Sequence, residues 1–346
     1  MDHTNSPEEI LLPELEICDP HLHLWRIGNE EYLLASYLKD MTDGHHVTSA
    51  VYVECRSGYW DAMYRSYGPE HLFPVGETEF AVAIAKQAAQ SGKGVAAGIV
   101  GFVDLRLGRK AGEVLDHHAA VADGRFKGIR QGASWDEDPE IVGMAPPVGP
   151  GLYLRADFME GMRELTKRGL TFDAWLYQTQ LDDLIALASA MPDQSIIVNH
   201  CGGVLGIKRY RSHEAELFAD WKIKMSRLSR LPNVSVKLGG LGMHRSGLDF
   251  GTPARSIGSL ALAELIRPWI ETCLDLFGPD RCMFEGNFPV DRTAYSYRVM
   301  WNAFKRIARD YPAHERQLLF GGTAKRIYRL NLLRQDGAGQ GGEPAV

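Results

Sequence analysis

Short apolar runs alternate with longer amphipathic stretches along most of the chain, beginning at residue 16. The short runs are rich in Val and Ile, as buried strands are, and the longer stretches repeat their apolar residues at the spacing of one helix face. Strands are predicted at residues 16–23, 48–56, 95–104, 126–132, 170–177, 195–200, 234–238 and 281–287. Helices are predicted at residues 77–90, 111–122, 156–167, 181–190, 214–230, 259–277, 293–309 and 318–330.

This regular alternation of strand and helix predicts a parallel sheet. About eight such units over roughly 300 organised residues suit a (β/α)8 TIM barrel of the α/β class, formed by a single domain at residues 16–331. The alternative is an open, doubly wound sheet, but no glycine-rich phosphate loop follows the first strand. Residues 1–15 are expected to form a flexible lead-in, and the glycine-rich residues 332–346 a disordered tail.

The composition is that of a soluble globular protein with a large core: 346 residues, 45% of them hydrophobic, with a formal net charge of −6. No long basic stripe is present, which argues against nucleic acid as a partner. The five cysteines are scattered and form no Cys-x-x-Cys pair, so neither a zinc ribbon nor a disulfide framework is expected. The acidic, polar start is no secretory signal and no apolar run reaches membrane-spanning length, so we expect a cytoplasmic protein without a membrane partner.

Polar residues gather toward the carboxyl ends of the predicted strands. In the first strand Asp19, His21 and His23 alternate, so their side chains share one face. The outer face of a parallel barrel packs on helices and must be apolar, so polar residues near the strand ends point into the barrel mouth. Later strands add further residues of this kind: Glu54, Arg56, Arg130, Asp173, Tyr177, His200, Lys237, Glu285 and Asn287. Their co-occurrence predicts a functional site at the mouth, because a buried charge must be paired, solvated or used.

Structural roles stay open for some of these charges. Lys237 carries a charge that could neutralise Asp173 or Glu285 inside the barrel. Arg56 and Glu54 could pair on one face of their strand. Either pairing would stabilise the barrel without taking part in chemistry.

The histidines divide into two groups. His45 and His46 fall in a turn, and His117 and His118 on a polar helical stretch, so all four are expected on the solvated surface. His200 instead closes an apolar strand, where a histidine has little structural reason to be. We therefore expect His200 to be functional.

Several segments of the chain resemble one family of enzymes. The segment DPHLHLW at residues 19–25 resembles the first-strand signature of the amidohydrolase-2 family, within the amidohydrolase superfamily. Later blocks of that family resemble FKGIR at 126–130, VNHCGG at 198–203, VKLGG at 236–240 and MFEGNFPVD at 283–291, in the same order. The resemblance spans residues 16–331 and implies a TIM-barrel hydrolase. The family includes lactonases acting on sugar lactones and on pyrone or muconolactone carboxylates, and decarboxylases occur in related groups.

The resemblance implies roles for the residues at matching positions. His21 and His23 would hold a divalent metal such as zinc, or would hydrogen-bond the substrate directly. His200 would face the scissile carbonyl. Arg130 would grip an anionic group of the substrate.

The chain departs from the family at the eighth strand, where Asn287 occupies the position of the usual catalytic aspartate. A neutral amide cannot serve as a general base and is a poor metal ligand. Glu285 lies two residues earlier on the same strand face and is therefore the predicted base, with Asn287 orienting the water or the substrate. His21, His23 and Glu285 would form a three-ligand site with an open position, so the cofactor is either one divalent ion, zinc by preference, or none.

These residues together predict a hydrolase that opens the cyclic ester of a small carboxylate- or hydroxyl-bearing metabolite by water attack at the carbonyl. Arg130 and Arg56 would hold an anion of the substrate, and Lys237, Tyr177 and Asp173 would complete the binding site or its rim. Two alternatives stay open: a metal-assisted decarboxylase on the same barrel, and a catalytically silent ligand-binding barrel. The expected partner is a small anionic molecule. Barrel enzymes of this size often form homodimers, but no interface is readable from the sequence.

Overall fold

The structure of the protein, a computed structural model, describes residues 8–27, 30–56, 68–142, 148–251 and 256–330. Eight parallel strands form one sheet: β1 (Ile17–Leu22), β4 (Val47–Val53), β5 (Gly94–Gly101), β6 (Phe126–Arg130), β7 (Thr171–Ala174), β8 (Ile196–Val198), β9 (Val234–Leu238) and β10 (Cys282–Phe284). Each strand pairs with the next in this order. The first and last meet through hydrogen bonds from Asn287 N to His21 O (3.0 Å) and from His23 N to Phe288 O (2.9 Å). The sheet is therefore a nearly closed barrel, and the predicted single-domain TIM barrel is confirmed.

All eight predicted strands are present, but most end before the polar residues that follow them. The chain then turns sharply at the barrel rim. Arg56, His200 and Asn287 lie just past their strands with φ of 62°, 55° and 51°, in the left-handed region. This conformation costs energy for a residue with a side chain and is often found at functional sites.

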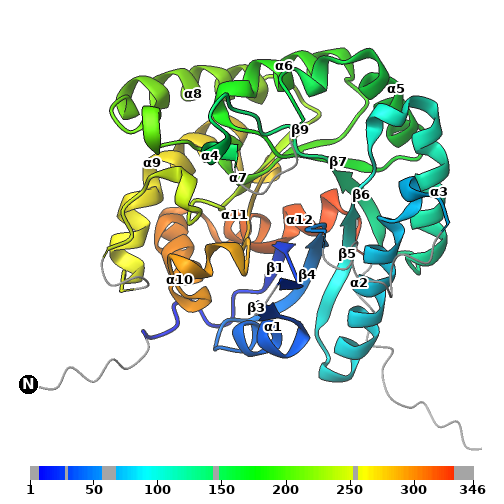
Figure 1. Cartoon of the computed structure of the whole chain (residues 1–346). Helices are drawn as coiled ribbons and strands as arrows, with labels where there is room; N and C mark the ends of the chain where they lie inside the picture. Colours follow the sequence, from blue (N-terminus) through cyan, green and yellow to red (C-terminus); the bar gives the residue numbers. More distant parts are fainter. Residues whose placement is uncertain (1–7, 28–29, 57–67, 143–147, 252–255, 331–346) are drawn as a thin grey trace, which may run out of the picture.

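Helices surround the strands on the outside of the barrel (Figure 1). Seven of them fall on predicted helices: α2 (Val75–Ala88), α3 (Ala111–Val121), α5 (Ala156–Lys167), α6 (Leu181–Ala190), α8 (Glu214–Ser229), α9 (Ser259–Phe277) and α10 (Tyr297–Ile307). The predicted closing helix is a π-helical turn at Leu318–Gly322 that runs into α12 (Thr323–Ile327). Among the helices of the described ranges, none has the length and apolar content needed to cross a membrane.

The structure adds short elements that were not predicted. β2 (Trp25–Ile27) and β3 (Glu30–Tyr32) pair antiparallel, and α1 (Leu34–Met41) follows them. Three brief helices also occur: α4 (Pro139–Val142), α7 (His200–Gly203) and α11 (Ala313–Gln317). Strands of three residues are too short to show an alternating pattern in the sequence.

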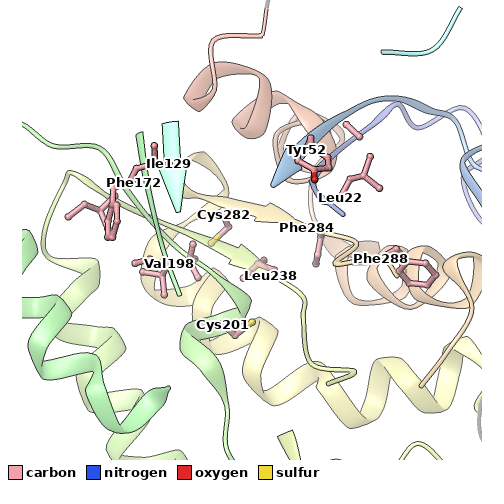
Figure 2. Packing of buried hydrophobic residues seen from close by; sticks show 14 of the residues in the cluster. Leu22, Tyr52, Ile129, Phe172, Val198, Cys201, Leu238, Cys282, Phe284 and Phe288 are labelled. Atoms are coloured by element: carbon pink, nitrogen blue, oxygen red, sulfur yellow. The ribbon is translucent and has the colours of Figure 1, made fainter. Parts of the chain in front are cut away.

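Alternation along the strands divides their side chains into two sets. One set faces the helices and forms the main core, and Figure 2 labels Leu22, Tyr52, Ile129, Phe172, Val198, Leu238 and Phe284 from it. The other set faces the barrel interior, where Cys18, Val51, Val53, Val100, Ile197 and Met283 pack against Ala324 and Tyr328 from the end of the chain. Apolar residues thus fill one end of the barrel. The polar residues occupy the other end, where the strands finish.

The start of the described chain is fastened to α10. Leu11 N donates to Asn302 Oδ1 (3.0 Å), and Lys305 Nζ donates to Leu11 O (2.7 Å). Residues next to Leu11 are therefore anchored. Of the flexible lead-in predicted at residues 1–15, residues 1–7 lie outside the described residues, as does the tail predicted at residues 332–346.

The surface placement predicted for His45 and His118 is wrong. His45 Nδ1 lies 2.9 Å from Lys305 Nζ, and His118 Nδ1 lies 2.8 Å from Thr78 Oγ1. Both rings are buried, and burial lowers the pKa of each to about 4. Their nitrogens find hydrogen-bond partners, which removes most of the cost of burying a neutral imidazole.

Candidate active site

Glu285 is the centre of a polar cluster at the carboxyl end of the barrel. Its Oε1 lies 2.7 Å from His200 Nδ1 and accepts a hydrogen bond from the His200 backbone N (3.0 Å). Its Oε2 lies 2.7 Å from His21 Nδ1 but out of line for a hydrogen bond, so this oxygen has no hydrogen-bond partner within the described ranges. All three residues are buried. The fold thus brings together three predicted site residues from the first, sixth and eighth barrel strands.

Two glycines at the end of β9 make room for this cluster. A Cβ at Gly240 would lie 2.2 Å from His200 Nδ1, and a Cβ at Gly239 would lie 2.6 Å from Glu285 Cγ. Any larger residue at either position would displace these side chains. The glycines of the VKLGG segment therefore belong to the site, although no role was predicted for them.

The tautomers of two histidines follow from their partners. His23 Nδ1 lies 2.8 Å from Val53 O, which can only accept, so Nδ1 donates and Nε2 carries the lone pair. Glu285 Oε1 already accepts from the His200 backbone, so His200 Nδ1 donates to the same oxygen. The Nε2 atom of His200 is then the unprotonated nitrogen, as a general base requires.

Arg130, at the end of β6, connects the cluster to Glu54. Its Nε donates to Glu54 Oε1 (2.8 Å), and its Nη2 donates to Glu54 O. Its Nη1 lies 3.2 Å from His21 Nε2, which is 3.1 Å from His23 Nε2. Glu54 therefore pairs with Arg130 and not with Arg56, which corrects the pairing that the sequence had suggested.

Lys237 and Asp173 form a fully buried ion pair beneath the cluster, with Nζ 2.6 Å from Oδ2. Asp173 also accepts hydrogen bonds from Tyr328 OH (2.9 Å) and Asn199 Nδ2 (3.0 Å). Lys237 Nζ lies 3.3 Å from His21 Nδ1. Neither member of the pair lines the cavity above, where substrate contact was predicted for both. Their position indicates that they support His21 from below.

A cavity of about 580 Å³ opens above the cluster. Of the residues predicted at the barrel mouth, six line it: His23, Glu54, Arg56, Arg130, His200 and Asn287. Its apolar wall includes Trp25, Phe73, Phe102, Trp175, Met243 and Val290. The buried carboxylate of Glu285 lies behind this lining, as does the ring of His21.

Two of the arginines that line the cavity have no carboxylate partner in the part of the chain that the structure describes. The guanidinium of Arg56 lies 5.9 Å from the ring centroid of Phe102. Arg245 lies 5.8 Å from the ring centroid of Trp175, and its Nη1 donates to Tyr177 OH (2.6 Å). Tyr177, predicted at the rim, thus meets the cavity through Arg245, since its own side chain does not line it.

Arg245 and Trp175 were not among the predicted site residues. The ring of Trp175 packs edge-on against His200, with centroids 4.8 Å apart. Trp175 follows β7 and lies on the same face of the predicted strand 170–177 as Asp173 and Tyr177. This position could have indicated that its side chain belongs to the site. Arg245 lies in a short helical turn, His244–Ser246, in the connection after β9, where one sequence offers no sign that a particular arginine turns inward.

Burial shifts the titration of the clustered groups. It raises the pKa of Glu285 to about 8, and the positive charge of Lys237 opposes this rise. Burial also lowers the pKa of His200 and of His21 well below the ordinary value, and nearby Lys237 and Arg130 add to the effect. Both imidazoles are therefore neutral at neutral pH, so His200 is available to accept a proton.

The cluster has the donor chemistry of a divalent metal site. Donor atoms of His21, His200 and Glu285 all lie within 4.8 Å of one another, and Glu285 Oε2 is the partnerless oxygen noted above. The Nε2 atoms of His21 and His23 are 3.1 Å apart, close to the roughly 3.3 Å expected between two nitrogens on a tetrahedral zinc. Imidazole and carboxylate groups therefore fit zinc here, although the described residues group His200, and not the predicted ligand His23, with His21 and Glu285.

Known proteins resemble the chain over nearly its whole length. The family model described as Amidohydrolase matches residues 18–330. The uncharacterized protein y4mH of Sinorhizobium fredii is 31% identical over 341 residues, which cover 92% of this chain and 100% of the relative. The L-fucono-1,5-lactonase of Burkholderia multivorans is 26% identical over 328 residues, which cover 90% of this chain and 95% of the relative.

A solved structure shares the same architecture. It is an amidohydrolase from Burkholderia multivorans with bound zinc, with a TM-score of 0.68 and 25% identity, and the match covers 91% of this chain and 99% of that one. The family match includes all eight barrel strands and the cluster around Glu285. The chain belongs to the amidohydrolase family.

Proposed function

We propose that the protein is a lactonase, which adds water to the carbonyl of a small cyclic ester and opens the ring to a hydroxy acid. The observation that carries this proposal is the His200–Glu285 pair at the base of an open cavity. The similarity to an L-fucono-1,5-lactonase supports the reaction type.

We assign the general base to His200, with Glu285 acting through it. His200 lines the cavity, whereas Glu285 lies behind the imidazoles. The hydrogen bond from His200 Nδ1 to Glu285 Oε1 leaves Nε2 free to take a proton from the attacking water, and the carboxylate stabilises the imidazolium that forms. In this assignment Glu285, which the sequence predicted to be the base, orients His200 and stabilises its positive charge instead of touching the water.

His200 both removes a proton from the attacking water and returns it to the leaving oxygen of the ring. Water attacks the carbonyl carbon while one of its protons passes to His200 Nε2, and the carbonyl oxygen becomes an oxyanion. Arg130 lines the cavity and is held rigidly by Glu54, so it is placed to stabilise this negative charge. When the tetrahedral intermediate collapses, the ring oxygen leaves and recovers the proton from His200.

The cavity favours a substrate that carries a carboxylate. Arg56 and Arg245 bring positive charge to its lining without a carboxylate partner from the described residues. A guanidinium in a partly dehydrated site gains most from an anion that it can grip by paired hydrogen bonds. The ring of Trp175 offers a flat apolar surface beside Arg245 for the body of the lactone. We therefore propose an anionic lactone in preference to an uncharged sugar lactone.

A divalent ion held by His21 and Glu285 would polarise the lactone carbonyl when bound. The protein supports such a site from below, since the buried Lys237–Asp173 pair holds His21 in place. The identity of the ion, zinc by donor type, is part of this proposal.

A panel of lactones with and without a carboxylate tests the proposed function. Acid release is followed by pH-stat titration, and carbon dioxide is measured in the same reactions. Stoichiometric acid without carbon dioxide is expected, and His200→Ala should lower kcat by about 10²–10⁴. Release of carbon dioxide from carboxylated substrates would instead identify a decarboxylase, and a panel without turnover would contradict the lactonase.

A further inference from the structure

Asp291 is a fully buried carboxylate that the mechanism above does not use. It lies in the helical turn Val290–Thr293, after β10. Its Oδ1 accepts a hydrogen bond from Asn287 Nδ2 (2.8 Å). Its Oδ2 accepts from Tyr295 OH (2.6 Å) and from the Gly242 backbone N (3.1 Å). All three partners act as donors, which matches a carboxylate that can only accept.

Asn287 meets the cavity with one end of its amide. Its backbone is left-handed, with φ of 51°, a conformation that Asn adopts more readily than most residues. The amide has one donor end and one acceptor end, and Asp291 takes the donor end. The oxygen Oδ1 is left without a hydrogen-bond partner among the described residues, although Asn287 lines the cavity.

We propose that Asp291 is a positioning residue, which fixes the Asn287 amide so that Oδ1 accepts a hydrogen bond from the attacking water. The water would then give one proton to His200 Nε2 and point the other at Asn287. Its lone pair would face the lactone carbonyl. This inference rests on the proposed hydrolysis and explains why an amide serves at a position where the family usually carries an aspartate.

The same carboxylate also ties Asn287 to the loop after β9. The hydrogen bond from Gly242 N fixes that loop three residues before Arg245. A Cβ at Gly242 would lie 2.9 Å from Asp291 Cβ, so the contact requires glycine. Asp291 therefore holds the Asn287 amide in a fixed position relative to the loop that carries Arg245.

Asp291→Asn tests the proposal because the aspartate has an acceptor oxygen at both Oδ1 and Oδ2, whereas the asparagine has only one. At Oδ2 a backbone N–H and the Tyr295 hydroxyl both donate, so the new amide oxygen should settle there. Its NH₂ group then faces Asn287, whose amide must turn its oxygen away from the cavity. We expect kcat to fall by about 10–100-fold with KM within about threefold of wild type, since orientation is lost and substrate binding is kept.

Tyr295→Phe is the matched control. It removes one of the two donors at Oδ2 and leaves the bond between Asp291 and Asn287 intact. We expect this variant to keep kcat within about twofold of wild type. A loss equal to that of Asp291→Asn would mean that general destabilisation explains both, and would overturn the proposal.

The exchange Asn287→Asp/Asp291→Asn separates orientation from stability. Asn287→Asp alone places two carboxylates against each other and should lower Tm, whereas the exchange restores a carboxylate–amide pair with its polarity reversed. The exchange should recover both Tm and most of kcat. Recovery of Tm can be measured even if the protein hydrolyses no lactone. An error in the proposed function can therefore be distinguished from an error in the proposed pairing of Asp291 with Asn287. The proposal is overturned if Asp291→Asn keeps wild-type kcat, or if the exchange is no better than the single variants.

Discussion

Glu285→Gln removes the negative charge behind His200 while keeping the shape of the side chain. The new amide oxygen can still accept from the His200 backbone N and from Nδ1, so the ring keeps its orientation. What disappears is the attraction between the carboxylate and the imidazolium that forms as His200 takes a proton from water. At matched metal content, the substitution therefore isolates the electrostatic part of the proposed mechanism.

The size of the effect follows from the geometry. With 2.7 Å between Nδ1 and Oε1, the two charge centres lie about 4 Å apart, and at an effective dielectric constant of about 20 they attract by about 4 kcal/mol. Losing this attraction in the transition state lowers kcat by about 10³, at about 1.4 kcal/mol for each factor of ten. KM should change little, because Glu285 does not line the cavity.

The pH of the assay matters, because burial raises the pKa of Glu285 to about 8. The carboxylate is charged mainly above that pH, so the ratio of wild-type kcat to Glu285→Gln kcat should grow as pH rises from about 7 to about 9. Rates are measured by pH-stat with saturating lactone, after subtraction of spontaneous hydrolysis and at matched metal content. A kcat within about threefold of wild type at the alkaline end would refute the assignment of His200 and Glu285 as the base pair.

Three further predictions follow from the same site. The pKa of Glu285 rises from 4.5 to about 8 on folding, so between these pH values the folded protein keeps a proton that the unfolded chain has released. The Tm of the wild type should therefore fall relative to that of Glu285→Gln as pH rises from 4.5 to about 8. Parallel profiles of Tm against pH would contradict the raised pKa. Arg245→Gln should lower kcat/KM for a carboxylate-bearing lactone by about 10–100-fold and keep kcat/KM for the corresponding methyl ester within about threefold of wild type. Equal losses on both substrates would show that Arg245 does not bind the carboxylate of the substrate. Elemental analysis should find zinc in the purified protein, lose it in His21→Ala and keep it in His200→Ala. Wild-type zinc in His21→Ala would argue against the metal site, and loss of zinc in His200→Ala would argue against His200 as a free base.

Most of the barrel could be predicted from the sequence, because its strands and helices carry strong and different periodicities. Helices α5, α6 and α9 begin and end at the predicted residues. The β2–β3 hairpin could not be predicted, since each strand is three residues long and gives no pattern. The buried place of His118 was missed because its partner Thr78 lies 40 residues away in the sequence.

The members of the site were easier to predict than their contacts. His21, His200 and Glu285 follow from one rule, that polar residues at the ends of barrel strands face the mouth. Which charge meets which depends on strand register and side-chain reach, so the pairing of Glu54 with Arg130 was not evident. Loop residues such as Arg245 obey no such rule. Their inward direction is set by tertiary contacts that one sequence does not reveal.

The most direct test of the central claim is the fate of oxygen from water. The purified protein is incubated with a carboxylate-bearing lactone in H₂¹⁸O, and the product is analysed by mass spectrometry against a blank without protein. We predict a ring-opened hydroxy acid with a single ¹⁸O in the newly formed carboxylate, formed about 10²–10⁴ times more slowly by His200→Ala. Release of carbon dioxide from the substrate would contradict hydrolysis by water activated at His200. The same conclusion would follow if every lactone of the panel described above were recovered intact and unlabelled.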